Sequence, residues 1–102
     1  MLVISREVHE SLIIGEDLQL QVVKIRGTTP NLRITRSLIG GRMTEELFSG
    51  WLEKDRSLDL GNGIVCVVVD VRDSKVRLGI EAPKEISIHR KEVYDAIRRT
   101  QQ

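Results

Sequence analysis

Two histidines and one cysteine are the residues best suited to nucleophilic, acid–base or metal chemistry in this sequence. His9 and His89 are far apart, and Cys66 is the single cysteine. Neither a His-x-x-x-His spacing nor a Cys-x-x-Cys pair occurs, so the pattern indicates no metal site. Gly40-Gly41 and Gly61-Asn62-Gly63 lack the Lys-Ser/Thr of a phosphate-binding loop and are interpreted as turns. We therefore expect no catalytic residues, no cofactor and no enzyme activity.

The surroundings of Cys66 also favour a structural role. Cys66 lies in the apolar run 64–69, which predicts a buried, unreactive thiol, and a lone cysteine excludes an internal disulfide. No apolar stretch approaches the ~18 residues of a membrane span. The first six residues lack the basic and apolar regions of a secretion signal. We expect a cytoplasmic protein without a membrane partner.

A binding surface is the remaining kind of site that the residues support. Arg6 ends a predicted first strand, and His89-Arg90-Lys91 stands where a predicted last strand meets a terminal helix. If these two strands are neighbours, the side chains form a local basic patch on a chain whose net charge is only +1. Arginine can donate paired hydrogen bonds to guanine or to phosphate. On the residues alone, ordinary solvated surface arginines are the alternative interpretation.

Aromatic residues make up only 3% of the chain. Many proteins that bind single-stranded nucleic acid stack bases on aromatic side chains. An RNA-binding role here would therefore use arginine, backbone groups and aliphatic contacts instead.

The elements that would position these groups are mostly strands. Aliphatic and β-branched patterns predict strands over 2–6, 12–14, 18–26, 32–38, 64–72, 75–80 and 86–89. An amphipathic helix is predicted near 44–54, because Thr44 can cap it and one face gathers Met43, Leu47, Phe48, Trp51 and Leu52. A C-terminal helix is predicted over 91–99. We expect a mainly β fold with about seven strands and two helices.

A weak internal repeat is present within these elements. Residues 23–26 followed by 32–34 are similar to residues 69–72 followed by 76–78, and both units are strand–turn–strand. Chance similarity between two amphipathic hairpins is an equally good explanation of the pattern alone.

Three segments resemble the carbon storage regulator (CsrA/RsmA/RsmE) family. Residues 1–6 are similar to the family's opening Met-Leu-aliphatic-Leu-Thr-Arg, and residues 10–15 to its Glu-x-Leu-x-Ile-Gly segment. Residues 76–94 are close to residue-for-residue with the family's later half. The resemblance covers 1–39 and 64–99, and it implies antiparallel sheets arranged as a barrel-like sandwich.

The resemblance also implies a function, that of a small bacterial post-transcriptional regulator. Family members bind GGA motifs in RNA hairpin loops of mRNA leaders, repress translation or alter mRNA stability, and can be sequestered by small RNAs. They are not enzymes. Arg90 matches the arginine credited with the guanine contact. The implied RNA-binding positions are Ile4, Ser5, Arg6, Ala82, Pro83, Ile86, Ile88, His89 and Arg90.

Two departures from the family pattern shape the expected architecture. His9 stands where the family has Gly, at a turn that we expect to need unusual backbone angles. The family's third–fourth hairpin also occurs twice, which divides one domain (1–102) into a first half (1–39), a helical insertion and connector (40–63) and a second half (64–102).

The duplicated hairpin suggests a pseudo-dimeric monomer with one RNA site. We hypothesise that the first strand borders the second hairpin and that the last strand borders the first half. A homodimer, formed through the inserted helix or free sheet edges, is the alternative oligomeric state.

A different class of function is also open. The chain could be a protein-interaction module, an antagonist that pairs with CsrA-type proteins or a flagellar-assembly partner without contacting RNA. Retention of both Arg6 and Arg90 favours RNA binding.

Overall fold

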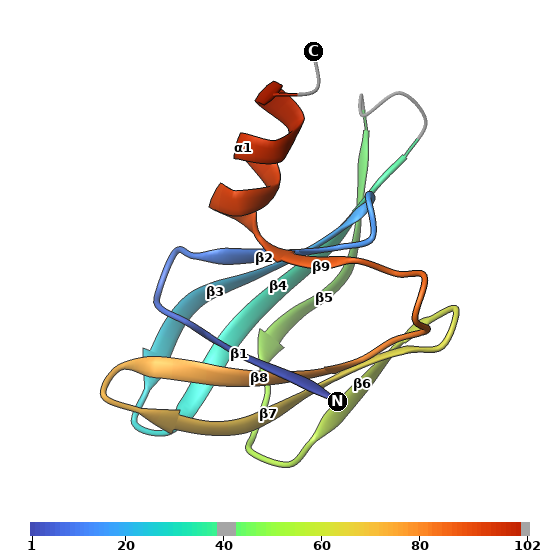
Figure 1. Ribbon diagram of the computed structural model, residues 1–102. Coiled ribbons are helices and arrows are strands. Elements are labelled where there is room, and N and C mark those ends of the chain that lie inside the picture. The colour runs from blue at the N-terminus through green and yellow to red at the C-terminus, as the bar shows by residue number, and fades with distance from the viewer. Residues whose placement is uncertain (39–42, 101–102) are drawn as a thin grey trace.

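The computed structural model describes residues 1–38 and 43–100 (Figure 1). Most of its strands are segments in which apolar and polar residues alternate. In the five-stranded sheet the order is β5-β4-β3-β2-β9, and in the four-stranded sheet it is β1-β8-β7-β6; all neighbours are antiparallel. The elements are β1 (Leu2–Arg6), β2 (Ser11–Ile14), β3 (Leu18–Arg26), β4 (Thr29–Ser37), β5 (Thr44–Trp51), β6 (Ser57–Gly61), β7 (Ile64–Arg72), β8 (Lys75–Glu81), β9 (Ile88–Arg90) and α1 (Lys91–Thr100).

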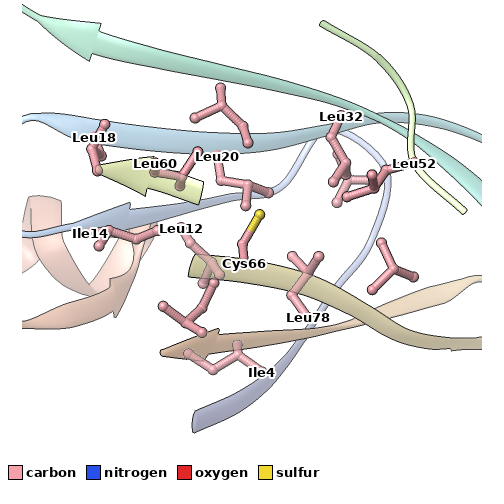
Figure 2. Packing of buried hydrophobic residues seen from close by; sticks show 14 of the residues in the cluster. Ile4, Leu12, Ile14, Leu18, Leu20, Leu32, Leu52, Leu60, Cys66 and Leu78 are labelled. Atoms are coloured by element: carbon pink, nitrogen blue, oxygen red, sulfur yellow. The ribbon is translucent and has the colours of Figure 1, made fainter. Parts of the chain in front are cut away.

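The core lies between the two sheets. Every second residue of the long strands faces inward, as the pleat of a strand requires, so Leu20, Leu32 and Leu78 are fully buried. Cys66 is also fully buried, which confirms the sequence prediction, and Figure 2 shows it pointing from its strand toward Leu20 of the opposite sheet. Burial raises the pKa of the Cys66 thiol to about 11.

The internal repeat is larger than the sequence indicated, because β5–β8 repeat β1–β4. His9 and Asp55 both have positive φ, 75° and 67°, and their N–H groups donate to Val22 O at 2.7 Å and Val68 O at 2.9 Å. The strand pairing shifts register directly after these acceptor residues in both repeats, between Val22 and Lys24 in the β3–β4 pair and between Val68 and Asp70 in the β7–β8 pair. Residues at this constant separation in sequence (9 and 55, 22 and 68) are called equivalent below.

The two repeats exchange strands. The first strand of each repeat pairs with the last strand of the other, β1 with β8 and β5 with β4, and β9 pairs with β2. The hypothesis that the first strand borders the second hairpin and the last strand borders the first half is therefore confirmed. The two sheets differ at one edge. In the five-stranded sheet β9 pairs with the outer side of β2, whereas no strand within 1–38 and 43–100 pairs with the outer side of the equivalent strand β6.

The predicted helix near 44–54 is wrong, and so is the count of about seven strands and two helices. Residues Thr44–Trp51 form β5, which pairs along β4, and Ser57–Gly61 of the predicted connector form β6. The described residues contain nine strands and the single helix α1, Lys91–Thr100. Long-range pairing with β4 prevails over the helical spacing of the apolar residues, and Gly50 weakens the helix further.

Three smaller outcomes concern the other sequence expectations. The turn at His9 does need unusual backbone angles, as its positive φ shows. The predicted boundary between 39 and 40, with the Gly40-Gly41 turn, lies outside the described residues. In the part of the chain that the structure describes, no helix is long and apolar enough to span a membrane, and no group of three or more His, Cys, Asp or Glu residues is placed to hold a metal ion.

Candidate nucleic-acid interface

A surface groove of about 230 Å³ separates the start of β1 from the segment that leads into β9. Four of the predicted RNA-binding residues, Ala82, Pro83, Ile86 and Ile88, line it. The remaining lining residues are Met1, Leu2, Ile80, Glu81 and Lys84. The groove, called the β1–β9 groove below, is therefore lined by aliphatic side chains together with the charged residues Glu81 and Lys84 and other polar atoms.

The segment between β8 and β9 changes sheets, and backbone contacts hold it in place. Ile86 N donates to Pro83 O at 3.0 Å, and Gly15 N donates to Ser87 O at 2.7 Å. Gly63 has φ 78°, and a Cβ there would lie 3.3 Å from Pro83 Cγ, so the β6–β7 turn supports the segment closely. The groove wall is thus a fixed piece of backbone whose exposed polar groups can face a ligand.

Alternation along β9 separates the last three predicted site residues. Ile88 lines the β1–β9 groove, and Arg90 lies two positions later on the same face with an exposed side chain. His89 points to the other face, where it lines a separate hollow with Tyr94 and Arg98. Arg90 therefore does not line the groove itself, but it is an exposed cation on the same face of β9 as Ile88, which does.

Arg6 occupies a different kind of position, because its side chain is only 5% exposed. Nη1 and Nη2 donate to Oε1 and Oε2 of Glu92 at 2.8 and 2.9 Å, and Nη1 also donates to Ser11 O at 3.1 Å. The hydrogen bonds from Arg6 are the main reason that the pKa of Glu92 falls to about 2, and the charge of Arg90 lowers it further. Arg6 thereby joins β1 to the first turn of α1, directly after Arg90.

The two other β1 residues point in opposite directions. Ile4 is in the core and pairs with Leu78, whereas Ser5 lies on the outer face and pairs with Arg77. The structure thus brings together the loop residues and Ile88 in one groove, whereas Ile4 is a core residue and Arg6 is held by Ser11 and Glu92.

Sequence reasoning missed six residues of this region. Five of them line the β1–β9 groove, Met1, Leu2, Ile80, Glu81 and Lys84, and the sixth, Glu92, pairs with Arg6. Lys84 offered a signal, because it is a basic residue inside the predicted loop. Nothing in the sequence pattern signals the pairing of Glu92 with Arg6, since 86 positions separate them.

The β1–β9 groove and the Arg6–Glu92 pair beside it occur once in the described residues. The position equivalent to Arg6 is taken by Leu52, whose N–H donates to Pro30 O at 3.0 Å. In the second repeat the strand that would match β9 is absent from beside β6. Among the residues that the structure describes, the groove with Arg6 and Arg90 close to it therefore has no counterpart in the second repeat.

Comparison with known proteins identifies the fold's relatives. The profile of the CsrA global regulator protein family matches residues 1–36 and 53–99. No solved structure matches the chain significantly. The unmatched stretch 37–52 includes β5, the strand equivalent to β1, so the match omits the part of the repeat that has diverged most.

Curated relatives agree with the family match. The translational regulator CsrA of Rhodopirellula baltica is 55% identical over 47 residues, which are 46% of this chain and 67% of that protein. The CsrA of Ruminiclostridium cellulolyticum is 45% identical over 42 residues, 41% of this chain and 58% of that protein. That of Clostridium botulinum is 46% identical over 46 residues, 45% and 65% of the two chains. The matches thus span two thirds or less of the relatives' length, and with the family profile they show that the chain belongs to the CsrA family of global regulators.

Proposed function

We propose that this chain is an RNA-binding post-transcriptional regulator that binds GGA-containing hairpins in mRNA leaders or small RNAs. The observation that carries the proposal is the β1–β9 groove, which the start of β1 and residues of the 80–88 segment form within one chain of a CsrA-family fold, with the exposed Arg90 two positions after Ile88. Binding there controls translation or mRNA stability. Residues 1–102 act as one RNA-binding domain in the cytoplasm.

The groove suits an unpaired base that is held without aromatic stacking. Its lining combines aliphatic side chains with polar atoms, its backbone is fixed, and the exposed Arg90 can donate two hydrogen bonds to the O6 and N7 atoms of guanine. In this proposal Arg6 is a positioning residue, because its guanidinium is already committed to Glu92 and Ser11. His89 lies on the face of β9 opposite Ile88, so it can contact only RNA backbone that passes on that side.

The proposal includes a stoichiometry of one hairpin for each chain. Leu52 in place of Arg6, and the absence of a described strand on the outer side of β6, support a single site. Sedimentation of the protein with increasing hairpin RNA measures this ratio. A monomer that binds one hairpin is the expected result, and two hairpins bound to each chain would contradict it.

Substitution of Arg90 tests the function itself. We expect Arg90→Ala to weaken binding of a GGA hairpin by ~1–3 kcal/mol, as loss of a paired guanine contact does. Arg99→Ala is the matched control, because Arg99 is an exposed cation at the far end of α1. A hairpin with CCA in place of GGA controls for sequence. Unchanged affinity of Arg90→Ala, or equal binding of both hairpins, would contradict sequence-specific RNA recognition and favour the protein-interaction alternative.

A further inference from the structure

Trp51 lies outside the β1–β9 groove, at the end of β5, and two cations cover it. The Arg26 guanidinium is 4.6 Å from the ring centroid, and the Lys24 ammonium is 5.4 Å from it. Trp51 is nevertheless 37% exposed, and both cations are exposed as well. Lys24, Arg26 and Trp51, called the Trp51 cluster below, thus combine an aromatic face with two positive charges at one place on the surface.

Comparison of the two repeats shows that this cluster is not a requirement of the fold. The register places Trp51, Asn31 and Lys24 in one row across β5, β4 and β3. The equivalent row across β1, β8 and β7 is Ser5, Arg77 and Asp70. The same backbone therefore accepts a small hydroxyl side chain where Trp51 stands and a carboxylate where Lys24 stands.

Ion pairing in the two rows also differs. Asp70 forms salt bridges with Arg77 at 3.2 Å and with Arg72 at 3.5 Å. Neither Lys24 nor Arg26 forms a salt bridge with any residue that the structure describes. The positive charge of the Trp51 cluster is thus left available for an anionic ligand, whereas the equivalent charges in the other sheet are paired.

We propose that the Trp51 cluster is a second RNA contact, which binds an unpaired nucleotide flanking the hairpin held in the β1–β9 groove. The base stacks on the part of the Trp51 ring that the two cations leave exposed, as bases do on aromatic side chains. Lys24 and Arg26 neutralise the adjoining phosphates. Because any base has a stacking face, this contact tolerates different sequences. The assignment to a hairpin flank rests on the proposed function, but single-strand binding by the cluster is testable without it.

The first test uses intrinsic fluorescence, because Trp51 is the single tryptophan of the chain. Titration with a short oligouridine, which contains no GGA, is expected to quench Trp51 emission, and added salt is expected to weaken the effect. No change at saturating oligouridine would overturn the proposal. Equal quenching by an acidic oligoglutamate peptide would also overturn it, since the cluster would then be a surface for acidic protein segments.

The second test compares a GGA hairpin with and without a single-stranded flank. Lys24→Ala/Arg26→Ala and Trp51→Ala are each expected to weaken binding of the flanked hairpin about ten-fold and to leave the unflanked hairpin unaffected. Arg72→Ala is the matched control, because Arg72 is equivalent to Arg26 and is also exposed. Trp51→Phe keeps an aromatic face and should retain most of the affinity, even if Trp51→Ala folds poorly.

The outcomes of the second test separate the two proposals. Equal affinity of wild type and the cluster variants for the flanked hairpin would overturn the second contact while the GGA site stands. If neither hairpin binds wild type, the proposed function fails, and the oligouridine titration alone decides whether the cluster binds a single strand.

Discussion

Replacing Glu92 by glutamine removes the charge that holds Arg6. Arg6 donates two hydrogen bonds to the carboxylate, and its side chain is 5% exposed whereas that of Glu92 is 60% exposed. A hydrogen bond to a charged group contributes ~1.5–3 kcal/mol, and solvent screening at the exposed partner reduces this. The glutamine side chain keeps one oxygen acceptor but turns an NH₂ group toward the guanidinium. We therefore expect Glu92→Gln to lower the free energy of unfolding by ~1–2 kcal/mol at pH 7.

Urea denaturation of matched variants measures this difference. Asp95→Asn is the control, because Lys91 and Asp95 form a shorter contact of 2.7 Å in the same helix with both side chains exposed, 43% and 47%. An exposed helical pair of this kind contributes only ~0.3–0.5 kcal/mol. If Glu92→Gln and Asp95→Asn lower the stability equally, burial of Arg6 does not strengthen its pair, and the reasoning fails.

The pH dependence of the same variants provides an independent check. The pKa of Glu92 is lowered to about 2 in the folded protein, against ~4.3 in an unfolded chain. A lowered folded pKa gives stability that is fully present above the unfolded pKa and is lost as the pH falls toward the folded one. The difference in stability between wild type and Glu92→Gln should therefore shrink between about pH 5 and pH 2. A difference that stays constant over this range would refute the assignment.

Two further predictions concern the turn at His9 and the buried thiol. His9→Gly should raise the free energy of unfolding by ~0.5–1 kcal/mol in urea denaturation, because His9 has φ 75° and glycine adopts that conformation without strain. Glu7→Gly is the control and should lower the free energy of unfolding, because φ is not positive at Glu7. A His9→Gly protein less stable than wild type would contradict strain at the turn. Cys66, whose pKa burial raises to about 11, should react with a thiol reagent at pH 8 far more slowly in the native protein than in urea. Equal rates, followed by absorbance, would show that the core opens readily.

The strands that the sequence identified are those whose apolar residues are β-branched or alternate over a long stretch, such as 18–26 and 64–72. β5 was missed because Leu47, Phe48 and Trp51 happen to have helical spacing, and only the register with β4 makes Thr44–Trp51 a strand. β6 does show alternation, with Leu58 and Leu60 between polar residues, but it is short and ends in a turn. Pairing with a neighbouring strand of the chain, β4 for β5 and β7 for β6, decided both cases, and the residue pattern within one segment does not contain that information.

The candidate site was predictable in part for a similar reason. Positions in the loop and β9 were identified by resemblance and do lie together, because backbone hydrogen bonds hold that segment against Gly15. The burial of Arg6 was not predictable, since it depends on Glu92 in a helix packed beside β2 and β9. A basic residue at a strand end can be a ligand contact or a structural anchor, and its partner decides which.

Duplication followed by loss explains the asymmetry of the fold better than two equal halves would. The second repeat keeps the turn hydrogen bonds and register shifts of the first, yet Leu52 replaces Arg6 and β6 has no described outer partner. An open sheet edge invites pairing with other chains, and short, irregular or charged edge strands resist it. β6 has all three properties: it is short, with five residues, it is irregular, with a register shift between Asp59 and Gly61, and it carries a charge, the exposed carboxylate of Asp59. The β6 edge is thus protected rather than prepared for another strand, which agrees with the single RNA site that we propose for each chain.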